Sequence, residues 1–78
     1  MIDFKKTGKV VSLGGGRFEF TAKGNGEVIV GEVFRHNFNW QATIPYGGRK
    51  FCVISETRIG AVRAAITSLR CAVNRGLV

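Results

Sequence analysis

The sequence predicts an α+β fold, in which an antiparallel meander of four to five strands is followed by one C-terminal amphipathic helix. Two observations indicate this class. Turn signals containing glycine divide residues 1–55 into segments whose side chains alternate between apolar and polar, as in strands with one buried face. From residue 59 onward, apolar residues recur every three or four positions, which is the spacing of a helix with one buried side. The 78 residues are expected to form a single domain.

The first three strands are expected over about residues 9–13, 17–23 and 27–34. Three consecutive glycines end the first segment, and the second alternates strictly, with Phe18, Phe20 and Ala22 on one face. A Gly-Asn-Gly turn then leads into a third segment rich in β-branched side chains. Asparagine and glycine favour a hairpin there because both tolerate positive φ.

The fourth and fifth strands are expected over about residues 38–44 and 50–55, separated by a turn that begins at Pro45. The helix is expected over about residues 57–74, with Ser55 or Thr57 as its N-cap and Gly76 as its stop signal. Its apolar stripe runs through Ile59, Val62, Ile66, Leu69 and Val73.

The chain is strongly basic, with twelve Lys and Arg against five Asp and Glu, a formal net charge of +7. Residues 33–78 carry most of this excess, and arginine supplies most of it there. Such a surplus attracts polyanions, and arginine is well suited to phosphate forks and to stacking on bases.

Three further observations bear on where in the cell the protein is expected. No apolar run approaches the length of about 20 residues that a membrane span requires, and the N-terminal residues lack an apolar signal core. Cys52 and Cys71 are expected to be buried, reduced thiols rather than a disulfide. We therefore expect a cytoplasmic or nucleoid-associated protein that is neither exported nor bound to a membrane.

Catalysis is not expected. A nucleophile needs a base with an orienting partner, but His36 is the only histidine, and the only aspartate, Asp3, lies near an N-terminus expected to be frayed. One histidine and two isolated cysteines do not supply a zinc site, and the glycines at 14–16 are better explained by a hairpin than by a phosphate loop. We expect no enzyme, metal, cofactor or small-molecule substrate.

Nucleic-acid binding fits the composition better. Residues 34–50 hold four of the eight aromatic side chains and three cations without an acidic residue, as in proteins that bind single strands by neutralising phosphates and stacking on bases. Trp40 shares a face with Ala42 and Ile44, so it is a candidate for the core as well as for stacking. The predicted nucleic-acid site comprises Arg17, Lys23, Phe34, Arg35, His36, Phe38, Trp40, Arg49 and Lys50.

The order of these features resembles the single-stranded-DNA-binding domain of the positive cofactor four transcriptional coactivators, and the Whirly proteins share the same plan. The resemblance covers about residues 17–74 and rests on Gly48-Arg49-Lys50 entering the last strand and on a strand running into Arg35, with Phe38 soon after. It implies that these two residues and the basic pair contact DNA. It also implies a homodimer formed mainly through the helix, which would place Ile59, Val62, Ile66 and Leu69 partly at the interface.

Two alternatives stay open. The segment from Trp40 to Ile44, followed by a glycine turn, a strand and an alanine-rich helix, is also similar to the three-stranded arm-binding domains of integrases and to ethylene-response factors. Those domains lay a sheet into the major groove of duplex DNA, which implies the readers Arg17, Asn39, Gln41, Thr43 and Lys50. The other alternative is a basic adaptor for an acidic protein partner.

Overall fold

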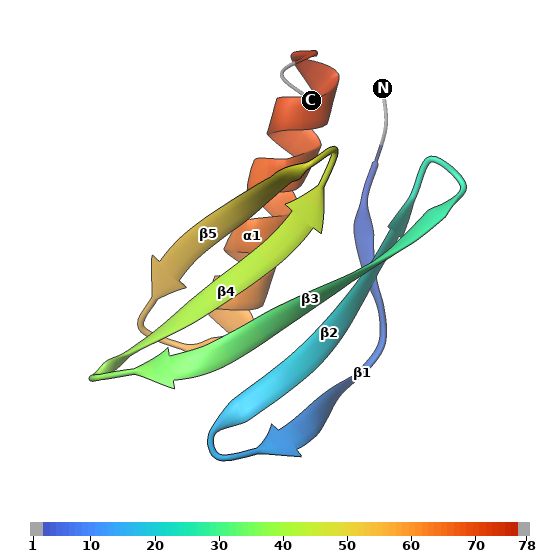
Figure 1. Cartoon of the computed structure of the whole chain (residues 1–78). Helices are drawn as coiled ribbons and strands as arrows, with labels where there is room; N and C mark the ends of the chain where they lie inside the picture. Colours follow the sequence, from blue (N-terminus) through green and yellow to red (C-terminus); the bar gives the residue numbers. More distant parts are fainter. Residues whose placement is uncertain (1–2, 77–78) are drawn as a thin grey trace.

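The computed structural model describes residues 3–76, which form a five-stranded antiparallel sheet and one helix (Figure 1). The order of the strands in the sheet is their order in the sequence, and α1 lies across one face. This confirms the predicted α+β class. The elements are β1 (Lys5–Gly14), β2 (Arg17–Gly24), β3 (Glu27–His36), β4 (Asn39–Tyr46), β5 (Arg49–Ser55) and α1 (Arg58–Asn74).

Tight two-residue turns join the strands, and their backbone explains the glycine pattern. In the turn between β2 and β3, Asn25 has a φ of 53° and Gly26 a φ of 74°. Consecutive positive φ values match the twist of an antiparallel hairpin, and few residue types adopt them without strain. The predicted bounds of β2 to β5 are correct within two residues because these turns are legible in the sequence.

The core lies between the sheet and α1. Phe20, Val33, Ala42 and Ile44 project from β2, β3 and β4 and are fully buried, and alternation in the sequence predicts the buried face of β2 and of β4. The helix contributes a matching stripe that includes Val62, Ile66 and Leu69. Burial of these side chains is the main favourable term for so short a chain.

The helix begins as the sequence predicts. Thr57 has extended backbone angles, and its side-chain oxygen accepts a hydrogen bond from the backbone N–H of Gly60 at 3.0 Å. This satisfies one of the N–H groups that have no partner within the first turn. Thr57 is therefore the N-cap, and Gly76, with a φ of 71°, follows the last turn.

The N-terminal segment is more ordered than predicted, since β1 begins at Lys5 rather than near residue 9. Phe4 is fully buried, and its ring lies edge-on to that of Tyr46, with 5.6 Å between the centroids. Arg70 donates a hydrogen bond to the carbonyl oxygen of Phe4 at 2.8 Å and lies 3.1 Å from the carboxylate of Asp3. Contacts with α1 and β4 therefore hold Asp3 and Phe4, whereas the terminus expected to be frayed lies outside the described residues.

Two further expectations need correction. Cys52 and Cys71 are both exposed rather than buried. Cys52 lies on the face of the sheet that α1 leaves open, and Cys71 lies on the outer side of α1. Val62, Ile66 and Leu69, expected at a helical dimer interface, are buried in the chain's own core. Of the four predicted interface residues only Ile59 is exposed in the single chain, and dimerisation stays a prediction.

No helix within residues 3–76 combines the length and the apolar character that crossing a membrane requires.

Candidate nucleic-acid interface

The predicted site residues divide between the two faces of the sheet. The strand register and the alternation of buried side chains place some of them on the face opposite α1, here called the open face, and others on the side of α1. The open face carries Arg17, Lys23, Phe34, His36 and Lys50. The helix side carries Arg35, Trp40 and Arg49.

They also divide between the two ends of the sheet. Arg35, His36 and Trp40 lie near the β3–β4 turn, which holds Phe38, at the end where α1 begins. Lys23 lies by the β2–β3 turn at the opposite end, and the pair Arg49 and Lys50 follows the β4–β5 turn there. The structure therefore does not bring the basic pair together with Arg35 and Phe38.

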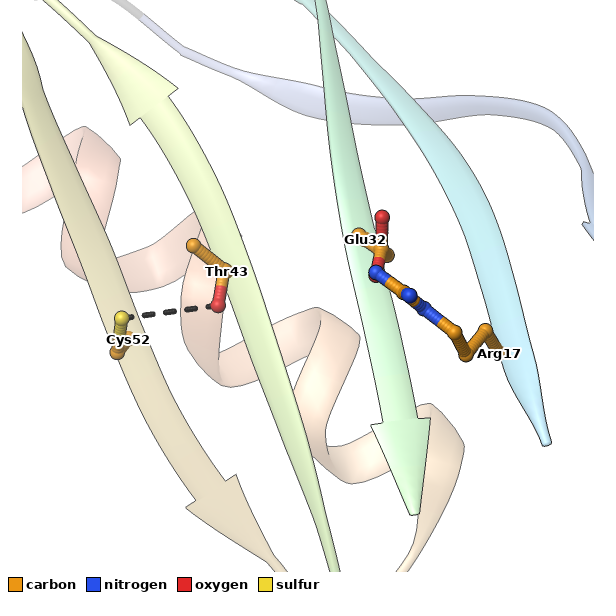
Figure 2. Close-up of polar contacts among 4 residues, drawn as sticks. All are labelled: Arg17, Glu32, Thr43 and Cys52. Carbon is orange, nitrogen blue, oxygen red and sulfur yellow. Dashed lines mark hydrogen bonds and ion pairs between the residues drawn. The ribbon is translucent and has the colours of Figure 1, made fainter. Parts of the chain in front are cut away.

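The open face is less basic than expected. Arg17 on β2 donates to the carboxylate of Glu32 on β3, with its Nε 2.8 Å from the acceptor oxygen (Figure 2). Glu19 lies opposite Glu32 in the strand register. A shallow hollow of about 350 Å³ on this face is lined by both carboxylates as well as by Arg17 and Lys50. Because anionic and cationic groups alternate here, the positive potential that phosphates require is weakened.

The centre of the open face is polar and uncharged. Asn39, Gln41 and Thr43 project from β4, the strand next to the β5 edge, and Thr43 Oγ1 lies 3.6 Å from the sulfur of Cys52 on β5 (Figure 2). Gln41 lies between two apolar side chains, Phe34 on β3 and Ile54 on β5. This row offers hydrogen-bonding groups between apolar side chains.

A cluster of cations and rings forms on the helix side, at the end where α1 begins. The rings of Phe18 and Trp40 lie 5.8 Å apart, and Arg58 Cζ lies 4.3 Å from the centre of the Phe18 ring and 6.0 Å from that of Trp40. Arg35 Cζ lies 5.9 Å from the Trp40 ring. We call these four residues the arginine–aromatic cluster. Such contacts hold guanidinium groups over ring faces.

The cluster settles the position of Trp40, whose ring packs half-buried against the core instead of standing free on the open face. Sequence reasoning missed Arg58 as a partner of these rings. It treated Phe18 only as a core residue. The alternating pattern indicated the face of Phe18, but no local signal in the sequence shows that the first residue of α1 reaches it.

Phe38 stands apart from this packing. It lies in the β3–β4 turn after Asn37, which has a φ of 57°, and 90% of its surface is exposed. Arg35 Nε lies 3.4 Å from the carbonyl oxygen of Asn37, so the arginine and the turn are in contact. The turn that presents this exposed ring is thus in contact, through its backbone, with a cation of the cluster.

No protein family, curated protein or solved structure was found to match this chain, so the resemblances drawn from the sequence stay predictions. Among residues 3–76, no three histidine, cysteine, aspartate or glutamate side chains gather in a way that would hold a metal ion.

Proposed function

We propose that this chain binds nucleic acid, with a preference for single-stranded DNA, by neutralising phosphates and stacking bases on an exposed ring. The observation that carries the proposal is the 90% exposure of Phe38 beside the arginine–aromatic cluster. Every unstacked base has an apolar face that such a ring can cover, so this binding does not depend on the nucleotide sequence.

The arginines of the cluster suit phosphate binding. Neither Arg35 nor Arg58 has an ion pair with any acidic side chain in the described part of the chain. A guanidinium group that lies over a ring still has N–H groups at its edges, and these can donate to phosphate oxygens. Phe38 would then stack a base while Arg35 and Arg58 hold the adjacent backbone.

The test is fluorescence anisotropy with a labelled twelve-nucleotide thymidine strand and a duplex of equal length. Substitution Phe38→Ala removes the stacking ring and is expected to weaken single-strand binding about 5- to 150-fold, which corresponds to about 1–3 kcal/mol. Val28→Ala is the control, since Val28 is another exposed apolar side chain but lies at the opposite end of the sheet. Equal affinities of the two variants would contradict the role of Phe38.

A second candidate function is duplex binding through the open face. The row of Asn39, Gln41 and Thr43 favours it, because amide side chains pair with adenine in the major groove and that groove admits strands. In that case the duplex binds more tightly than the single strand, and Gln41→Ala weakens duplex binding while Phe38→Ala does not.

A further inference from the structure

A groove separates the edge strand β1 from the first two turns of α1. It has a volume of about 330 Å³ and is lined by Lys6, Val10, Arg58, Ile59, Val62 and Arg63. We propose that this groove binds an acidic segment of a partner protein that carries one bulky apolar side chain. The groove shares Arg58 with the arginine–aromatic cluster, but its other lining residues lie outside the proposed nucleic-acid site, and the proposal does not depend on that function.

The floor of the groove is aliphatic. Val62 is buried beneath it and Val10 is half-buried, but Ile59 is 62% exposed although it continues the apolar stripe of α1. The sheet covers the rest of this stripe and leaves its first residue open. An apolar side chain from a partner that enters the groove would cover Ile59 and remove both surfaces from water.

The rim of the groove is cationic. Lys6 lies on β1 and Arg58 and Arg63 lie on α1, and none of the three forms an ion pair within residues 3–76. Among the residues that the structure describes, no acidic residue lines the groove, and the first turn of α1 contains none. The groove is therefore complementary to an anionic partner, and the partial positive charge at the start of α1 acts in the same direction.

Size and chemistry favour a peptide. A volume of about 330 Å³ lies at the lower limit of small-molecule pockets and is enough for one large side chain. Three cations on two elements call for several anionic groups along one chain, as a run of aspartates and glutamates provides. Single-stranded nucleic acid also carries several charges, but its binding gains from stacking on aromatic rings, and the described residues that line the groove include none.

The experiment measures binding of the full chain to a fluorescein-labelled ten-residue peptide of aspartates and glutamates with one central phenylalanine. A second peptide has alanine in place of the phenylalanine. The phenylalanine peptide is expected to bind at least fivefold more tightly. Arg63→Glu should weaken its binding at least tenfold, whereas Arg75→Glu makes the same change of charge beyond α1 and should have an effect within twofold.

Substitution Ile59→Ala tests the apolar contact by itself. It should reduce the preference for the phenylalanine peptide to less than twofold and leave affinity for the alanine peptide unchanged. If wild-type protein binds both peptides equally, or if Arg63→Glu and Arg75→Glu weaken binding alike, the attraction is due only to net charge and the proposal is wrong.

The same variants separate this proposal from the nucleic-acid function. Phe38→Ala should leave peptide binding unchanged, and Arg63→Glu should weaken oligonucleotide binding no more than Arg75→Glu does. If Arg63→Glu instead selectively weakens oligonucleotide binding and spares the peptide, the groove belongs to a nucleic-acid surface and the peptide proposal is overturned. If Phe38→Ala weakens oligonucleotide binding and leaves peptide binding unchanged, the result supports two separate sites, one for each ligand.

Discussion

At the scale of single residues, Gly31 and Phe20 pack so closely that position 31 has no room for a side chain. The two residues face each other on β3 and β2, and a Cβ added to Gly31 would lie 2.4 Å from Cζ of the buried Phe20 ring. Gly31→Ala must therefore displace this ring, and we expect it to lower the free energy of unfolding by about 1–3 kcal/mol. Urea unfolding of the variant measures this loss.

The control is a double-mutant cycle. In a Phe20→Leu background the clash with the ring is absent, so Gly31→Ala should cost much less there than in the wild-type chain. If Gly31→Ala lowers the free energy of unfolding equally in the two backgrounds, the destabilisation arises from the backbone of β3 and not from the contact with Phe20.

This contact also marks a limit of sequence reasoning. The alternation of Phe18, Phe20 and Ala22 correctly predicts which face of β2 is buried, because the period is local. Gly31 interrupts a run of β-branched residues, and nothing beside it in the sequence indicates a ring above it. The need for glycine there comes from the pairing of β2 with β3.

At the scale of elements, the start of α1 depends on one side-chain hydrogen bond. Thr57→Ala removes the acceptor for the backbone N–H of Gly60, and we expect it to lower the free energy of unfolding by about 0.5–2 kcal/mol. Thr67→Ala is the matched control, because Thr67 is exposed within the same helix and alanine has the higher helix propensity. Thermal unfolding of both variants checks the prediction, which fails if Thr67→Ala is as destabilising as Thr57→Ala.

The elements differ in how far the sequence predicts them. The turns and the N-cap are local, so β2 to β5 and α1 are predicted within two residues. The start of β1 is not predicted from the sequence. Phe4 packs against Tyr46 and is bonded to α1, and only the assembled sheet defines the positions of these partners. The candidate site follows the same rule. Phe38 is singled out because it follows the polar stretch Arg35–Asn37, but it is expected at the start of a strand and lies in the turn before β4. The contact of Arg58 with Phe18 joins the start of α1 to β2, which only the assembled fold brings together.

At the scale of the whole molecule, the charge of +7 predicts salt-sensitive binding of polyanions. Each phosphate neutralised on a single strand contributes about −0.7 to the slope of log affinity against log salt concentration. Arg35→Gln should therefore make this slope shallower by about 0.7, as measured by anisotropy at several salt concentrations. Arg75→Gln removes the same charge away from the cluster and should leave the slope unchanged.

The contact between Phe4 and Arg70 has a consequence for the order in which the fold assembles. Every strand pairs with its neighbour in sequence, so the hairpins form through short, rapidly closed loops. The hydrogen bond from Arg70 to the Phe4 carbonyl instead joins residues 66 positions apart, and closing so long a loop is entropically expensive until the intervening sheet exists. The N-terminal segment should therefore be the last part to dock and the first to detach. Its release would open the core from one end while the meander stays paired.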